Sequence, residues 1–574
     1  MKKTPDTKKI ATFAILIIIV GIGAYLRMTG LWWGLPGKGQ YFHGGSLYVD
    51  EVRVLKTIKS FNPKKLDFEP PPESYAYSRG AVPIYFSAFC MQIAKMSGWL
   101  KTVKDYAFYK KNPRELGKIY LAGRLGSVFV ALLTILVVFI VGRRYYGGAP
   151  AGLISAFICA ITPIHVVNSH YIQSDIYAGL GVALTLWASL IVAQKKDFRM
   201  RPYIIAGMAI GLTAQMKYVI FICAIFLVLA HYHALRNAPG TARPTLRRQT
   251  ALISAGALSS ILTFLALNPY FITNIPNVIN GLVFMRWAHA NQRVMPEFSS
   301  LFYATKGMWD SLGIPLYCFF ILSMITIIRK RNYFAIMALS FCLLLWLEHA
   351  TSTIWAYLRY NTATIPAVSL ICGCAYWEYE KRRAQSAALQ RWAIRVFFWA
   401  SCLFALGYSF TYSRLMSEQT VQSQASDYIV GNIPSGSRIG LAEMPFFNEP
   451  TIAMTQYWYS PEKPENKPLY ENMPRYDFIN LELSLEKLRK EMPDYLILTD
   501  FNFMPRYVSL EKSLDWRQQR FQTPFINEIF SNSSYELMTT LKRDIKAWGI
   551  NFAPGFPPED LRYIMPTILI FKKR

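Results

Sequence analysis

The sequence is poor in charged residues and lacks the cysteine patterns of secreted or metal-binding domains. Charged residues make up 17% of the 574 positions, against about 25% in soluble domains. The eight cysteines form no C-x-x-C pair, and none follows Cys402. These absences argue against a disulfide framework or a zinc knuckle and favour packing roles for the cysteines. The low charge content argues against a soluble protein.

Hydrophobic residues are abundant instead, at 53% of the chain with a mean hydropathy of +0.20. Apolar runs close to the ~20 residues that cross a bilayer recur along most of the sequence. The pattern predicts a polytopic α-helical membrane protein. Eleven spans are expected, at 11–28, 124–142, 151–170, 174–193, 202–217, 219–235, 250–268, 309–328, 333–349, 356–376 and 393–412.

Acidic residues are scarce, 35 against 62 Lys and Arg, which gives a net charge of +27. The excess does not lie in the C-terminal region, because residues 413–574 carry 19 basic and 20 acidic residues. It lies in short loops between apolar runs, which is typical of the positive-inside bias and of attraction to anionic membrane lipids. We therefore expect membrane lipids as partners and no nucleic acid.

The orientation depends on the apolar segment 81–100, because a crossing there would invert everything that follows it. Without that crossing, 17 basic residues of short loops face the cytoplasm; with it, all of them face outside. Short-loop Lys and Arg set orientation, so we expect 81–100 to lie against the outer surface. The first span then resembles an uncleaved signal anchor, since no A-x-A-like site follows it. The N-terminus is expected in the cytoplasm, and the 29–123 loop and C-terminus outside.

Composition changes after residue 412. "SRIGLAEM", "DYLILTD" and "TILIFKK" predict strands, and "SLEKLRKEM" predicts a helix. We expect a transmembrane domain at 1–412 and an extracytoplasmic α/β domain at 413–574.

Asp50 and Glu51 form an adjacent acid pair just after the first span. One interpretation is a solvated pair at the start of a surface helix, where acids complement the helix N-terminus. The other is a general base or a metal-ligand pair at a membrane-surface active site. The sequence leaves both open.

Three further charged residues lie at expected outer ends of spans. Asp175 precedes a new span, where it could serve only the helix N-terminus. Lys217 lies between two apolar runs and could snorkel to the interface or hold an anionic head group. Arg359, followed by Tyr360, could anchor the interface or clamp a phosphate. Histidines show no H-x-x-x-H pattern; a divalent metal held by Asp50, Glu51, His170 and Asp175 stays possible.

The acid pair is followed along the chain by "YSRGAVPIYF", "RLGSVFVALLTILVVFIVGRRYYGG", "AGLISAFICAITPIHVVNSHYIQSD", "GLTAQMKYVIF" and "LRYNTATIPAVSLICG". In this order these stretches resemble the GT-C glycosyltransferases, and most closely their protein O-mannosyltransferase and lipid A aminoarabinose transferase group. The resemblance covers roughly residues 10–412. The family often has His-Pro before its acid pair, and this chain has Tyr48-Val49.

The resemblance implies transfer of a sugar from a polyprenyl-phosphate donor to an acceptor hydroxyl, with inversion, on the extracytoplasmic side. It implies that Asp50 is the general base, that Glu51 orients it or binds the acceptor, and that Asp175 holds hydroxyls or an ion. Lys217, Arg359, Tyr360 and Arg79 would then bind the donor phosphate. The acceptor stays open among protein, lipid and glycan, and the membrane is expected to be a bacterial inner or plasma membrane.

Two other classes stay open from the sequence. A lipid or glycan transporter would show midplane charges, inverted repeats and broken helices, whereas the charges here cluster at span ends. A non-catalytic scaffold would use the C-terminal domain to bind a partner.

Overall fold

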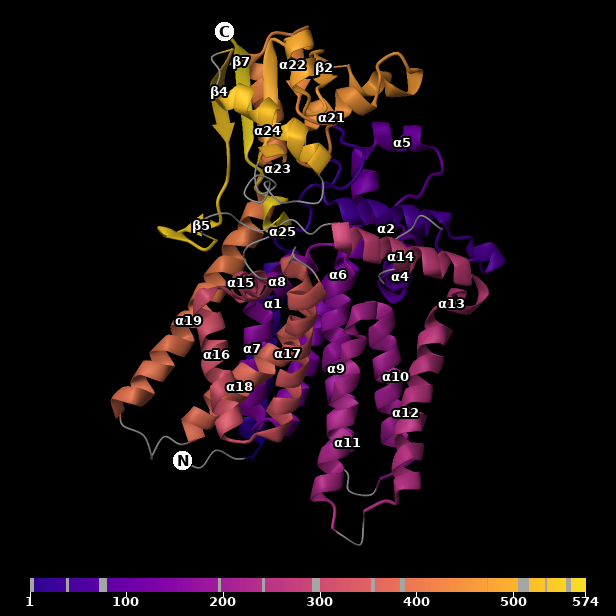
Figure 1. Cartoon of the computed structure of the whole chain (residues 1–574), viewed down its shortest axis with the longest axis vertical. Coiled ribbons are helices and arrows are strands. Elements are labelled where there is room, and N and C mark those ends of the chain that lie inside the picture. Colours follow the sequence, from indigo (N-terminus) through magenta and orange to yellow (C-terminus); the bar gives the residue numbers. More distant parts are fainter. Residues whose placement is uncertain are drawn as a thin grey trace.

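The computed structural model describes residues 5–37, 41–71, 80–194, 198–239, 243–291, 300–352, 357–381, 388–471, 473–503, 516–531, 534–553 and 559–574. Long helices occupy one end of the molecule and a β-sheet occupies the other (Figure 1). The N-terminus lies at the helical end, far from the sheet, and the C-terminus lies at the sheet (Figure 1). The architecture confirms a mostly helical membrane protein with a C-terminal sheet-containing region.

The helical part runs to Ser417. Its elements are α1 (Pro5–Met28), α2 (Val49–Ser60), η1 (Pro63–Lys65), α4 (Val82–Met96), α5 (Tyr106–Lys111), α6 (Pro113–Tyr145), α7 (Ala149–Ile161), α8 (Pro163–Ser169), α9 (Ser174–Gln194), α10 (Met200–Met216), η2 (Tyr218–Ala224), α11 (Ile225–Asn237), α12 (Leu246–Leu267), α13 (Tyr270–Thr273), α14 (Ile275–Asn291), α15 (Ser300–Leu312), α16 (Ile314–Arg329), α17 (Tyr333–Ser352), η4 (Leu358–Thr364), α18 (Ile365–Lys381) and α19 (Ala388–Ser417).

Seven helices of the described residues are long and apolar enough to cross a membrane, or up to nine if two bent helix pairs each count as one span. The pairs are α7 with α8, bent by 58°, and the end of α15 with α16, bent by 111°. Pro163 explains the first bend, because proline cannot continue the hydrogen-bonding of the preceding helix. Two expected crossings, 202–217 and 356–376, correspond to helices of 17 residues each, α10 and α18. The number of eleven crossings stays a prediction.

The ambiguous segment 81–100 forms helix α4, which has 15 residues. At 1.5 Å per residue it is shorter than the ~30 Å hydrocarbon core. Pro83, Ile84 and Met91 are buried, whereas Phe89 and Met96 are 58% and 78% exposed. One side of α4 therefore packs on the protein and the other presents apolar groups outward, as an interfacial helix does. Its expected place on the outer surface stays a prediction.

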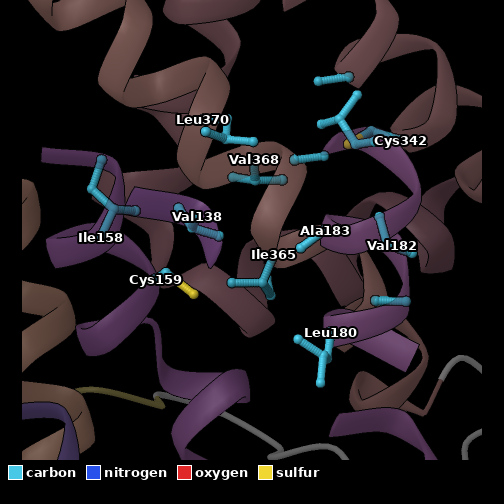
Figure 2. Packing of buried hydrophobic residues seen from close by; sticks show 14 of the residues in the cluster. Val138, Ile158, Cys159, Leu180, Val182, Ala183, Cys342, Ile365, Val368 and Leu370 are labelled. Carbon is cyan, nitrogen blue, oxygen red and sulfur yellow. The ribbon is translucent and has the colours of Figure 1, made fainter. Parts of the chain in front are cut away.

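The central core of the helical part joins α6, α7, α9, α17 and α18. Figure 2 shows Val138 of α6, Cys159 of α7, Ala183 of α9 and Val368 of α18 converging at short range. Small residues allow this approach: a Cβ at Gly152 would meet the carbonyl oxygen of Phe139 at 2.6 Å. Close backbone approach through small residues is the usual packing of membrane helices. Of the eight cysteines, six are buried.

The C-terminal region contains α20 (Val421–Asn432), β1 (Arg438–Leu441), α21 (Thr451–Trp458), η5 (Pro464–Leu469), β2 (Asp477–Asn480), α22 (Leu485–Glu491), β3 (Tyr495–Thr499), α23 (Asp500–Phe503), α24 (Trp516–Ser531), β4 (Tyr535–Leu541), β5 (Lys546–Ala547), β6 (Ile550–Asn551), α25 (Glu559–Arg562) and β7 (Ile568–Lys573). The sheet order is β2-β1-β3-β7-β4. Strand β1 pairs in parallel with β2 and β3, and β7 is antiparallel to β3 and β4. The predicted strands at β1, β3 and β7 and the helix at α22 are confirmed.

The C-terminal region is docked on the helices. Ile545, Phe552, Leu561 and Tyr563 belong to the same buried apolar cluster as the core helices. Phe552 contacts the Phe404 ring on α19, with ring centroids 5.1 Å apart, and the β5 hairpin extends beside α19 (Figure 1). The division at residue 412 stays a prediction. The described parts on either side of it share a core.

Candidate active site

The acid pair begins helix α2, which lies across the molecule between the long helices and the sheet (Figure 1). Tyr48 precedes the helix in an extended conformation, and both acids lie in the first helical turn, where the helix dipole favours negative charge. They are not a solvated pair, because Asp50 is 7% exposed and Glu51 is fully buried. Since adjacent side chains on a helix diverge, the two acids have different partners.

Glu51 is bound by Arg124 of α6, which is also fully buried. The guanidinium donates from Nε to Oε1 at 2.8 Å and from Nη2 to Oε2 at 2.6 Å. Glu51 also accepts from the hydroxyl of Ser46 and, at 2.9 Å, from the backbone N–H of Ile172. Bidentate pairing of this kind is strong and directional. Glu51 therefore connects α2, α6 and the loop before α9.

Asp50 faces Arg359, which comes from η4. Arg359 Nη1 lies 3.3 Å from Asp50 Oδ2 and donates to the Tyr48 hydroxyl at 2.9 Å. The same nitrogen lies 3.6 Å from Oδ1 of Asp560, and the Arg359 backbone N–H donates to Asp560 Oδ2 at 3.1 Å. Asp560 belongs to α25 in the C-terminal region. We call Tyr48, Asp50, Arg359 and Asp560 the central cluster.

The ring of Tyr48, a member of the central cluster, packs against two other tyrosine rings. It stacks on Tyr171 with centroids 4.1 Å apart and meets the Tyr563 ring at 5.1 Å. Burial raises the pKa of Tyr48 well above its usual value, although the Arg359 cation works in the opposite direction. The phenol therefore stays neutral and keeps its hydroxyl as a hydrogen-bonding group.

Asp175 and Lys217 form a second ion pair next to the central cluster. Asp175 lies in the first turn of α9, and Lys217 follows α10 in an extended conformation. Lys217 Nζ donates to Asp175 Oδ1 at 2.6 Å and lies 4.5 Å from the centre of the Tyr360 ring. Arg359 lies 5.8 Å from the centre of the same ring. The Tyr360 ring thus lies within cation–π distance of both cations.

The structure brings together Asp50, Asp175, Lys217, Arg359 and Tyr360. Arg79 lies outside the described residues. Neither ring nitrogen of His170 is aimed at these carboxylates, because they face the backbone oxygens of Val166 and Thr29 at 2.8 and 3.0 Å. In the stretches that the structure describes, no three His, Cys, Asp or Glu residues gather as a metal site would require. The four suggested metal ligands therefore do not form a set.

Sequence reasoning missed Arg124, Tyr48 and Asp560. An arginine within an apolar helix is costly and marks function or a partner, so Arg124 offered a signal that could have been used. Tyr48 was noticed only as a departure from the family pattern. Asp560 gave no signal, because only the fold brings it next to Arg359, 201 residues earlier.

Comparison with known proteins bears on one part of the chain. The family model for dolichyl-phosphate-mannose-protein mannosyltransferase matches residues 116–240. Those residues have the sequence pattern of that family. They contain Arg124, Asp175 and Lys217, three of the charged residues described above. The resemblance stated from the sequence is confirmed there. A comparison with curated proteins found no match.

Solved structures show a distant likeness over most of the chain. ArnT from Cupriavidus metallidurans bound to undecaprenyl phosphate is 12% identical, with a TM-score of 0.46 over 99% of this chain and 98% of that one. The oligosaccharyltransferase AglB from Archaeoglobus fulgidus, in complex with an inhibitory peptide and a dolichol-phosphate, is 11% identical. Its TM-score is 0.46 over 99% of this chain and 89% of that one. Likenesses this distant assign neither a substrate nor a residue's role.

Proposed function

We propose that the protein is an integral membrane glycosyltransferase. It would move a sugar from a polyprenyl-phosphate donor to the hydroxyl of a protein, lipid or glycan acceptor. The observation that carries the proposal is the buried Asp50 carboxylate 3.3 Å from Arg359, with Lys217 and Arg359 at 4.5 and 5.8 Å from the centre of the Tyr360 ring. A base beside two phosphate-binding cations is what such a transfer needs. The family match of residues 116–240 supports the same reaction.

In the proposed reaction the acceptor oxygen attacks the anomeric carbon from the side opposite the phosphate. The new carbon–oxygen bond forms as the bond to the phosphate oxygen breaks, so the anomeric centre inverts. Asp50 accepts the proton of the acceptor hydroxyl, and the polyprenyl phosphate leaves with the electron pair. Proton transfer to a positioned base contributes typically ~10²–10⁴ in rate. Glu51 positions the base and does not accept the proton, because Arg124 holds both of its oxygens.

Negative charge grows on the leaving phosphate oxygen, and Lys217 and Arg359 stabilise it. Arginine supplies paired donors, and lysine supplies a compact charge. In the structure each cation is held by a carboxylate, Lys217 by Asp175 and Arg359 by Asp50. A donor phosphate would share these cations with the carboxylates. Asp175 then orients Lys217 and can bind sugar hydroxyls.

The site is proposed to face the extracytoplasmic side of a bacterial inner or plasma membrane. This proposal rests on the short-loop Lys and Arg residues, which favour a cytoplasmic N-terminus. The site lies near the junction of the long helices and the sheet, at the end of the long helices away from the N-terminus (Figure 1). A lipid-linked donor suits an enzyme whose active groups lie at the boundary between lipid and water.

The experiment that tests this proposal is sugar transfer by the full-length protein in nanodiscs. A panel of polyprenyl-phosphate sugars would be supplied with and without EDTA, and polyprenyl phosphate release would be measured. Sugar-dependent release would support the enzyme and identify its donor, and loss of release with EDTA would show a metal requirement. If no donor is consumed while the same protein moves lipid between leaflets of liposomes, the transporter interpretation takes its place.

Lys217→Ala gives a test of the phosphate-binding assignment. We expect kcat/KM for the donor to fall by ~10²–10³, because removal of one group that stabilises transition-state charge typically costs that much. Donor titration of polyprenyl phosphate release measures the change. Lys118→Ala is the control, since Lys118 pairs with Glu115 on the same side of the protein but outside the site. Donor kinetics equal to those of the control would remove Lys217 from the mechanism.

A further inference from the structure

A pocket opens beside Asp50. Its walls come from α2, from the start of α4 and from the loop before α9. It has a volume of about 40 Å³ and is partly open to solvent. Asp50, Arg53, Thr57 and Gln173 supply polar groups to its lining, and Pro83 supplies apolar surface. The pocket thus combines hydrogen-bonding groups with a mostly apolar lining, to which Val54, Ile84 and Ile172 also contribute, next to the proposed base.

Gln173 is the unusual residue in this lining. It is 4% exposed, and within the described stretches neither its side-chain oxygen nor its nitrogen has a hydrogen-bond partner. A buried polar group without a partner costs ~1–3 kcal/mol, and most buried polar groups avoid this cost. An amide placed in a pocket without a partner has donors and an acceptor left for a ligand.

Hydrogen bonds and close packing hold the chain around Gln173 in place. The preceding residue, Ile172, donates its backbone N–H to Glu51, which Arg124 holds in turn. On the opposite wall, Gly80 has a φ of +98°, and a Cβ there would lie 2.3 Å from the carbonyl oxygen of Gln215. Only glycine fits such a conformation and approach. Both walls of the pocket are therefore anchored to the helical core.

The pocket lies on the acceptor side of the base. Asp50 contributes to the lining, but Lys217, Arg359 and Tyr360 do not. The groups proposed to bind the donor phosphate therefore lie around Asp50 outside this pocket. A hydroxyl that gives its proton to Asp50 from within the pocket would belong to the acceptor.

We infer that Gln173 is a specificity-determining residue whose amide binds a hydroxyl of a sugar acceptor, next to the hydroxyl that is attacked. This inference rests on the proposed function. A sugar hydroxyl both donates and accepts, and the amide of Gln173 can do the same. Five polar side chains line the pocket, since Ser174 joins the four named above. They are more than a lone serine or threonine hydroxyl could engage, and they suit the edge of a ring with several hydroxyls. Pro83 can cover ring carbons.

The test compares acceptors in the polyprenyl phosphate release assay, using full-length protein in nanodiscs. The probes are methyl glycosides, their deoxy analogues lacking one ring hydroxyl, and a serine-containing peptide. Gln173→Leu and Gln173→Met remove the amide at similar volume. Gln249→Leu is the control, because Gln249 lies on α12 at the end of the molecule away from the sheet (Figure 1).

The wild type should prefer a glycoside over one of its deoxy analogues by about tenfold, the value of one neutral hydrogen bond. Both Gln173 variants should raise KM for that glycoside about tenfold and lose the preference. The melting temperature should not fall, because burying an unpartnered amide costs stability and its removal relieves that cost.

Equal glycoside kinetics in wild type and both variants would overturn the inference, as would use of the peptide and of no glycoside. A lowered melting temperature with parallel loss of hydrolysis would show a structural role and overturn it too. If the wild type releases no polyprenyl phosphate with any donor, even by hydrolysis, the failure is that of the proposed function, and the inference falls with it.

Discussion

At the scale of single residues, Asp50 and Glu51 are neighbours with different surroundings. The sequence predicted their divergence, since consecutive side chains on a helix point apart, and it predicted Lys217 and Arg359 as cations near them. It could not predict that Arg124 takes both oxygens of Glu51, because α6 brings Arg124 there only in the folded chain. Nor could it distinguish a helix-start role for Asp175 from the pair with Lys217. The sequence identifies the charged residues near a candidate site. Only the packing of the folded chain decides which of them are paired with a buried partner.

Glu51→Gln should destabilise the protein by about 3–5 kcal/mol, because it leaves Arg124 buried without a compensating charge. Arg124→Met should destabilise the protein by a similar amount, because it leaves the Glu51 carboxylate buried without its cation. The double variant should lose less than the sum of the two, because the two residues act as one unit. Unfolding in detergent followed by circular dichroism measures all three.

Glu115→Gln serves as the control for this comparison of the single and double variants. Its pair with Lys118 is partly exposed and should be worth about 1 kcal/mol or less. If the Glu51 and Arg124 losses simply add, or if neither exceeds that of the control, the positioning role of Glu51 is wrong.

At the scale of elements, the sequence predicted β1, β3, β7 and α22 well. Each has a strong local signal: alternating or continuous apolar residues for the strands, and Ser484 capping α22 by accepting from Lys487 N–H. The strand order was not predictable, because β7 ends the chain yet lies between β3 and β4. The long helices were predictable as apolar runs, whereas the number that cross the membrane stays a prediction. The 111° bend between α15 and α16 was not predictable, because the apolar pattern continues through it.

Asp500, the first residue of α23, should make the stability of the protein depend on pH. Asp500 is 3% exposed, and burial raises its pKa from 3.8 to about 6, against the opposing charge of Arg562. The folded protein therefore holds the Asp500 proton more tightly than the unfolded chain. Wild-type stability should fall as pH rises from about 4 to about 6 and lose nothing more from this group above that range.

Asp500→Asn removes this titration. Relative to wild type, the variant should gain roughly 2–3 kcal/mol between pH 4 and pH 7. Melting temperatures across that range measure the difference, and Asp477→Asn on the exposed edge of β2 is the control. A constant difference between Asp500→Asn and wild type across the range would contradict the assignment.

At the scale of the whole molecule, the C-terminal region takes part in the site. The sequence predicted a separate external domain at 413–574 with no recognisable motif. In the structure, Asp560 of that region accepts a hydrogen bond from the backbone N–H of Arg359 and lies 3.6 Å from its guanidinium. Tyr563 of the same region packs its ring against that of Tyr48. No composition shift or spacing could show these contacts. Arg359 and Asp560 are 201 residues apart, and Tyr48 and Tyr563 are further apart still. The docking means that changes in the C-terminal region can alter the charge around Arg359, the cation proposed to bind the donor.

Asp560→Asn tests that connection. The amide oxygen can still accept the Arg359 N–H, but the negative charge 3.6 Å from its guanidinium is gone. Arg359 would then attract a phosphate more strongly, and KM for the donor should fall several-fold at low ionic strength, with the difference shrinking in salt. Steady-state donor titrations measure it, with Asp544→Asn as the control. An unchanged or higher KM would show that Asp560 does not share Arg359 with the donor.

The most direct test of the central claim, that Asp50 is the base of a sugar transfer, is turnover by Asp50→Asn. Polyprenyl phosphate release would be measured for wild type, Asp50→Asn and the exposed control Asp67→Asn, at equal melting temperature and saturating donor. We predict a fall of ~10²–10⁴ in kcat for Asp50→Asn alone, with donor affinity no lower than that of wild type, because the negative charge 3.3 Å from Arg359 is removed. Turnover by a correctly folded Asp50→Asn protein at the wild-type rate would contradict the mechanism.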